Sequence, residues 1–99
     1  MSEYIFIVHV REFFRLNENT YTVGRTSGTV KTRLRKYPRG SKLLFSIKVN
    51  DANKIKVIIK NTFDNKFKKK PVYGNDYYNG NINCMINEIQ DIVEKYNII

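Results

Sequence analysis

The sequence predicts a small α+β domain: a three-stranded antiparallel sheet flanked by three helices. Three segments have the apolar alternation or continuous apolar run of strands, and three have the apolar periodicity of helices. In chain order these segments span 4–10, 20–24, 30–37, 43–49, 51–70 and 81–96. The order ββαβαα in a chain of 99 residues indicates one compact domain over 1–99, because a chain of this length has room for only one core.

The sequence patterns of the three strand segments predict different degrees of burial for their two faces. Segment 4–10 is apolar at every position except His9, which is typical of a central strand covered on both faces. Segment 11–19 is largely polar and ends in Asn and Glu residues, so we expect a long hairpin loop before the second strand at 20–24. In segment 43–49, apolar residues alternate with Ser46 and Lys48, which predicts a strand with one exposed face.

The first two helices are marked by apolar residues at helical spacing. Val30, Leu34 and Tyr37 lie on one side of the first helix, which should end before Pro38 because proline disfavours a helical residue ahead of it. Segment 51–70 begins at Asp51 as a cap and closes on three lysines, whose charge suits the negative end of a helix.

The last helix, in segment 81–96, should pack on the core through its apolar side. Its exposed side carries Glu88, Asp91 and Glu94, and we expect this acidic side to face away from any anionic partner.

The charge of the chain is concentrated in its middle. Residues 25–70 contain fifteen Lys or Arg and only two acids, Asp51 and Asp64, a net charge of +13 (15 − 2) in a chain whose total is +9. A surface charged only for solubility would mix the two signs, so this segment predicts a polyanion as partner, with nucleic acid ahead of an acidic membrane surface. The residues expected to contact nucleic acid are Arg25, Lys31, Arg33, Arg35, Arg39, Lys56 and Lys60.

Several short motifs follow the predicted elements in order. They are Tyr4-Ile5-Phe6 in the first strand, Thr22-Val23-Gly24 in the second, Arg33 in the basic helix, and the loop 74–80, which reads GNDYYNG. Together they resemble the GIY-YIG nuclease superfamily, in particular the branch found in large DNA viruses and phages. The resemblance covers nearly the whole chain, and it implies a GIY-YIG-like fold and an active site for phosphodiester hydrolysis.

The resemblance implies roles for four positions of this sequence. In the family, tyrosines of both strands position and deprotonate a water, a helix arginine holds the phosphate, and a glutamate binds a divalent metal. Arg33 matches the arginine, but Phe6 and Thr22 stand at the tyrosine positions and Lys56 at the glutamate position. Phenylalanine has no hydroxyl to ionise, and a lysine repels Mg²⁺, so the catalytic site is expected to be degenerate.

Two residues offer a way to restore the chemistry. Tyr4 lies on the same strand face as Phe6 and is a substitute for the missing base, while Asp76 in the aromatic loop is a substitute metal ligand or else a turn residue that binds its own backbone. Tyr77 and Tyr78 beside it either stack on bases or cover the edge of the core.

We therefore expect a nucleic-acid-binding domain, with DNA as the favoured target, that has a GIY-YIG fold, an inactive site and no cofactor. One alternative is an active endonuclease that uses Mg²⁺ or Mn²⁺, and another is an interaction or inhibitor module whose basic face meets an acidic protein. The single Cys84 and the absence of a signal-peptide pattern predict an intracellular protein, and no apolar run is long enough to predict a membrane span.

Overall fold

A computed structural model of the chain describes residues 2–96. Within them lie five strands and four helices. In chain order they are β1 (Glu3–His9), α1 (Arg11–Arg15), β2 (Thr20–Thr26), α2 (Val30–Leu34), β3 (Lys42–Val49), α3 (Ala52–Lys66), β4 (Lys68–Lys69), β5 (Tyr77–Asn79) and α4 (Ile82–Tyr96). The α+β class is confirmed, but the expected counts of three strands and three helices are wrong.

The sheet is antiparallel throughout and has the strand order β3-β1-β2-β5-β4. β1 lies in the middle, between β2 and β3, as its continuous apolar sequence predicts. β5 extends the sheet by pairing with the first half of β2, where Thr22 lies opposite Tyr77. Beyond this point, from Gly24 to Thr26, β2 pairs only with β1 among the described residues. The second half of β2 therefore forms part of the sheet edge.

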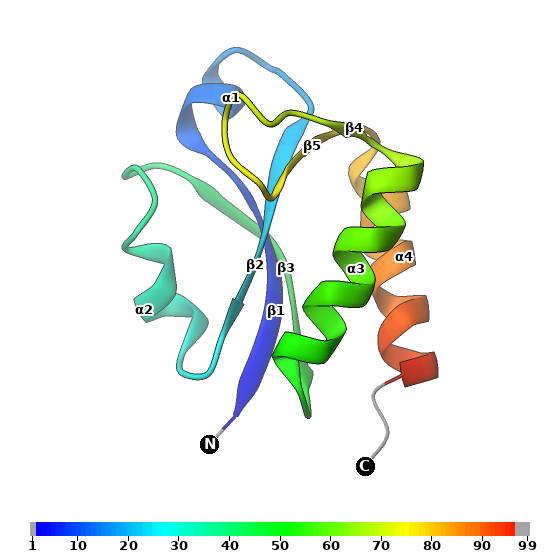
Figure 1. Cartoon of the computed structure of the whole chain (residues 1–99). Coiled ribbons are helices and arrows are strands. Elements are labelled where there is room, and N and C mark those ends of the chain that lie inside the picture. The colour runs from blue at the N-terminus through cyan, green and yellow to red at the C-terminus, as the bar shows by residue number, and fades with distance from the viewer. Residues whose placement is uncertain (1, 97–99) are drawn as a thin grey trace.

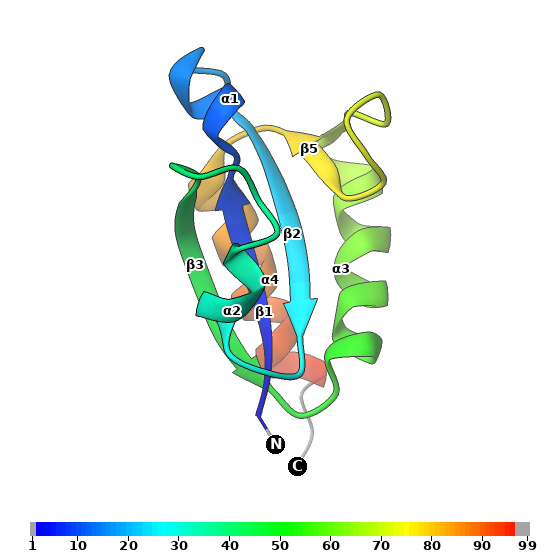
Figure 2. The same ribbon diagram turned by 90° about the vertical axis from the view of Figure 1, so that its left-hand side faces the viewer.

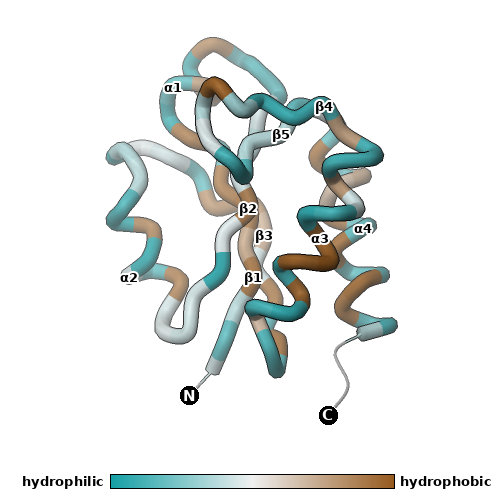
Figure 3. Tube along the Cα trace, in the orientation of Figure 1, coloured by the Kyte–Doolittle hydropathy of each residue, from teal (hydrophilic) through white to brown (hydrophobic). Residues whose placement is uncertain are grey.

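Helices cover both faces of the sheet (Figure 1). α2 lies on one face, while α3 and α4 lie on the other, and a view turned by 90° shows α2 in front of the strands and α4 behind them (Figure 2). Apolar residues concentrate in the central strands and along α3 and α4, whereas α2 is mostly hydrophilic (Figure 3).

Two apolar clusters fill the spaces on either side of the sheet. The larger one joins alternate residues of β1 and β2 to α3 and α4 and includes Ile5, Ile59, Met85 and Ile89, all at most 1% exposed. The smaller one lies under α2 and is built from Phe6, Val8, Val10 and Phe13, with Val30, Leu34, Tyr37 and Tyr77 packed against them. The smaller cluster matters for the motif residues, because Phe6 belongs to it and Thr22 is buried on the same face of the sheet.

Three short elements correct the sequence-based expectations. The segment expected to be a hairpin loop contains α1, which is anchored by Phe13. α3 ends at Lys66 and not at Lys70, because Phe67 is extended and the chain enters β4 there. Tyr77 to Asn79, expected to be loop, form β5.

Local capping explains where α2 and α3 begin. The hydroxyl of Thr29 accepts a hydrogen bond from the amide of Thr32 at 3.2 Å, and the carboxylate of Asp51 accepts one from the amide of Lys54, also at 3.2 Å. The cap at Asp51 is the one that the sequence predicts, and of the two residues that could cap α2, Ser27 and Thr29, the structure uses Thr29.

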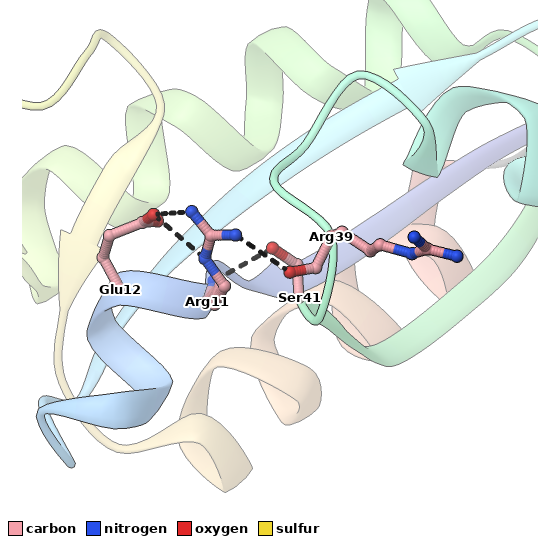
Figure 4. A network of polar contacts seen from close by, with 4 residues as sticks. All are labelled: Arg11, Glu12, Arg39 and Ser41. Carbon is pink, nitrogen blue, oxygen red and sulfur yellow. Dashed lines mark hydrogen bonds and ion pairs between the residues drawn. The ribbon is translucent and has the colours of Figure 1, made fainter.

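The loop after α2 is held against α1 (Figure 4). The Arg11 amide donates to the Ser41 hydroxyl at 2.9 Å, and the Arg11 guanidinium pairs with Glu12 at 2.8 Å and donates to the carbonyl of Arg39 at 3.4 Å. The guanidinium of Arg39 points away from this network (Figure 4). Arg39 is thereby fixed through its backbone while its charge stays exposed.

Among residues 2–96, no helix has the length and apolar character needed to cross a membrane.

Candidate nucleic-acid interface

The first motif position, Phe6, is a core residue. Its side chain is completely buried, and its ring makes an edge contact with Tyr37 of the α2 segment, with ring centroids 6.5 Å apart. The ring also lies directly over Gly24, so that a Cβ atom at Gly24 would stand 2.5 Å from it. Gly24 therefore has a packing reason to be glycine, independent of any substrate.

The second motif position, Thr22, is also buried, with 3% exposure. It lies opposite Val8 on the face that α2 covers, and its side chain hydrogen bonds with Tyr37. Burial raises the pKa of Tyr37, the nearby Tyr77 raises it further, and Arg33 and the bond with Thr22 only partly offset these effects. Neither motif position supplies a general base, and the tyrosine beside them is held protonated at neutral pH.

Arg33 of α2 is exposed and lines the same hollow as Thr26 at the end of β2. With Lys36 it lines a shallow hollow of about 370 Å³ whose other walls are Thr26, Gly28, Thr29 and Thr32. Threonine hydroxyls and two cations around an open hollow suit an anion such as phosphate. The position of Arg33 is thus compatible with the role of phosphate clamp that the family resemblance implies.

Lys56 and Asp76 meet in an ion pair; the family resemblance implies the glutamate position for Lys56 and a substitute metal ligand in Asp76. Lys56 Nζ lies 3.3 Å from Asp76 Oδ2, and Lys60 Nζ lies 3.9 Å from Asp76 Oδ1 and donates to the Asn75 carbonyl at 3.4 Å. Asp76 thus has two lysines as partners, which disfavours its expected role as a metal ligand. No group of three or more His, Cys, Asp or Glu side chains suited to a metal occurs within residues 2–96.

Of the two lysines that contact Asp76, Lys56 is the less exposed. Its side chain is 16% exposed, against 37% for Lys60. Burial lowers the pKa of Lys56, and the charges of Lys60 and Arg25 lower it further, while Asp76 acts in the opposite direction. Folding therefore disfavours the protonated form of Lys56, and the ion pair with Asp76 offsets only part of this cost.

The seven expected nucleic-acid contacts do not form one cluster. Arg25 pairs in register with Ile5, on the sheet face that α3 covers, and lies close enough to influence Lys56. Lys31, Arg35 and Arg39 line a second hollow of about 470 Å³ on the other side of α2 from Arg33. The structure thus brings Arg25, Lys56 and Lys60 together, with Arg33 and then the other three spread over α2 and the loop after it.

The remaining aromatic candidates are Tyr4, which lines a surface hollow, and Tyr77 and Tyr78, which pack on the two apolar clusters. Tyr4 lies opposite Thr26 and lines a hollow of about 520 Å³ with Ser2, Gly28, Thr29 and Val30, at the start of α2. Tyr78 is 2% exposed and donates a hydrogen bond to Asp64 at 2.7 Å, so it is part of the core and not a platform for bases. Tyr77 packs on Phe13 in the smaller cluster.

Tyr37 is the residue of this site that the sequence pattern missed. Its sequence position predicts the last apolar residue of a helix, but its side chain hydrogen bonds with Thr22, and Tyr77, Arg33 and Asp76 lie near enough to shift its pKa. The available signal is its amphipathic character at a helix end, where a tyrosine commonly buries its ring and leaves its hydroxyl for a polar partner.

Comparisons of the chain with models of protein families, with curated proteins and with solved structures return no match. The likeness to GIY-YIG nucleases therefore consists of motif residues and their order along the chain.

Proposed function

We propose that this chain is a nucleic-acid-binding domain, with DNA as the expected target, which has the GIY-YIG nuclease fold without the nuclease chemistry. The observation that carries the proposal is the Lys56–Asp76 ion pair, because a cation stands where the family binds a metal and engages the nearby carboxylate. The identity and burial of Phe6 and Thr22 under α2 support it further, since neither a phenyl ring nor a threonine hydroxyl packed in the core can take a proton from an attacking water.

Binding is supported by cations that have no acid to neutralise them. Within residues 2–96, four acids form ion pairs: Glu12 with Arg11, Asp76 with Lys56 and Lys60, Glu88 with Lys66, and Asp64 with Lys69. The cations of α2, of the strand end before it and of the turn after it have no such partner in this part of the chain; they are Arg25, Lys31, Arg33, Arg35 and Lys36. Unpaired surface cations release counterions when they meet phosphates, and this release drives non-specific binding.

The motif order and the strand pairing are consistent with the proposed family. β1 and β2 form the motif hairpin, Phe6 lies opposite Gly24, and the helix with Arg33 follows directly on the same side of the sheet as Phe6. This juxtaposition is what the family would need for a phosphate clamp beside its two strand motifs.

The test measures binding and cleavage on the same supercoiled plasmid, with Mg²⁺, with Mn²⁺ and with a chelator. We expect retarded plasmid and no metal-dependent nicking, because losing a general base alone costs about 10²–10⁴ in rate. Robust nicking by the parent protein, abolished in Arg33→Ala, would establish the endonuclease alternative. Failure to bind plasmid, together with capture by an acidic protein, would favour the interaction module.

A further inference from the structure

Two lysines share one carboxylate, and Arg25 lies near them, where the second half of β2 becomes a sheet edge. Lys56 and Lys60 both contact Asp76, at 3.3 and 3.9 Å, and Arg25 lies near enough to lower the pKa of Lys56. We call Arg25, Lys56 and Lys60 the Asp76 cluster. Its charges sum to +2 when Asp76 is included (3 − 1), so the cluster retains an affinity for a further anion.

The backbone of Asp76 is held in the sheet beside β2. The carbonyl of Asp76 accepts a hydrogen bond from the amide of Val23 at 3.2 Å, directly after the pairing of Tyr77 with Thr22. β5 lies beside β2 on the side toward α3 (Figure 2), so the loop ending at Asp76 reaches the lysines of α3. The sheet therefore holds the backbone of Asp76 within reach of these lysines.

The cluster is accessible to a nucleic-acid backbone. The side chains of Asp76 and Lys60 are each 37% exposed, whereas that of Lys56 is 16% exposed. An arriving phosphate would thus meet Lys60 and the carboxylate first, with the ammonium of Lys56 already positioned beneath them.

We propose that Asp76 occupies, in the free protein, a phosphodiester site formed by Lys56 and Lys60, and that it competes with the nucleic acid for these lysines. The inference rests on the proposed function and adds to it a defined contact and a restraint on affinity. A carboxylate and a phosphodiester each present anionic oxygens to ammonium donors, so one can replace the other. Removing the charge of Asp76 should therefore strengthen binding.

Asp76→Asn is the first test, because it removes the charge and keeps the shape of the side chain and its backbone bond. The matched control is Glu88→Gln, which changes the net charge equally and also releases an α3 lysine, Lys66, from an ion pair of 2.6 Å. Lys66 on α3 and Glu88 on α4 line a hollow between these two helices, and no residue of the Asp76 cluster lines it. Both variants and the parent are titrated against one fluorescent DNA duplex at fixed salt, after their folding has been checked by thermal melting.

We expect Asp76→Asn to bind about fivefold more tightly than the parent, the upper range for releasing an exposed ion pair, and Glu88→Gln to change affinity by less than about twofold. Equal gains in both variants would mean that only net charge matters, and weaker binding by Asp76→Asn would mean that Asp76 supports the complex. Either result overturns the inference while leaving the proposed function intact.

A second pair of variants tests the lysine directly. Lys56→Met should lower the steepness of the log-log salt dependence by about 1, as expected for one lost phosphate contact, whereas Lys66→Met should leave it unchanged. Equal slopes for Lys56→Met and the parent would refute the contact. If the parent protein itself binds no nucleic acid, the proposed function fails, and the inference fails with it.

Discussion

Gly24 shows that a residue which reads as a catalytic motif can be required for packing alone. Its missing side chain leaves room for the ring of Phe6, which is buried and has no space to retreat. Gly24→Ala should lower the free energy of unfolding by roughly 1–3 kcal/mol, as overpacking of a core does. Chemical denaturation measures this loss.

The control for Gly24 is Gly28→Ala, because the nearest atom to a Cβ at Gly28 is 3.9 Å away. A small change at Gly28 and a large one at Gly24 would assign the effect to Phe6. Equal stability of both variants would show that the Phe6 ring does not press on Gly24.

Lys56 should reduce stability while it serves binding. Its pKa in the folded protein is lowered mainly by burial, so the protonated form is disfavoured by folding and Lys56 costs stability at pH 7. Lys56→Met keeps the apolar stem and should raise the free energy of unfolding at pH 7 by roughly 0.5–2 kcal/mol. If Lys56→Met is more stable than the parent and binds nucleic acid less well, Lys56 serves binding and not stability.

The pH dependence of that difference checks its cause. Between the lowered pKa of Lys56 and its ordinary value of 10.5, the unfolded chain binds more protons than the folded one, so the parent gains stability as pH rises. The advantage of Lys56→Met should therefore shrink as the pH approaches 10.5. A constant advantage from pH 7 upward would exclude the charge of Lys56 as its source.

The position of Lys56 could be predicted from the sequence, but its contact with Asp76 could not. Regular helical spacing is enough to place Lys56 relative to the apolar stripe of α3, and only the family resemblance implies that a glutamate would stand there. Its partner Asp76 comes from a loop that only the pairing of β5 with β2 brings to α3, and no local pattern encodes that approach.

At the level of elements, the long periodic segments were predictable and the short ones were not. β1, β2, β3 and α4 match the expected segments closely, because each is at least seven residues long and its apolar residues follow the period of a strand or a helix. α1 has five residues and β4 only two, too few for a period to appear. The lysines of β4 also suit the end of a helix, so their extended conformation is set by pairing with β5.

α4 should contribute stability and leave the basic surface unchanged. Ile89 is completely buried in the larger core cluster, so Ile89→Ala should cost roughly 2–5 kcal/mol, the range for truncating a large aliphatic core residue. Thermal or chemical denaturation measures the loss, and binding at a temperature where the variant is folded should equal that of the parent. Parent-like stability would mean that α4 is not docked on α3 and the sheet.

For the whole molecule, the central claim is that uncompensated positive charge between residues 25 and 70 binds nucleic-acid phosphates without a metal. The claim depends on the sum of many cations, because the structure spreads the expected contacts over both sides of α2 and onto α3. A charge distribution of this kind predicts non-specific, salt-sensitive binding more directly than any single side chain does.

The most direct test is the salt dependence of affinity for duplex DNA, measured by fluorescence anisotropy with a chelator present. If about five phosphates are neutralised, a plot of log affinity against log salt should have a slope of about −4 to −5. The same slope should be found with Mg²⁺ replacing the chelator, after correction for its competition as a counterion. A flat salt dependence, or binding that requires the metal, would contradict the claim.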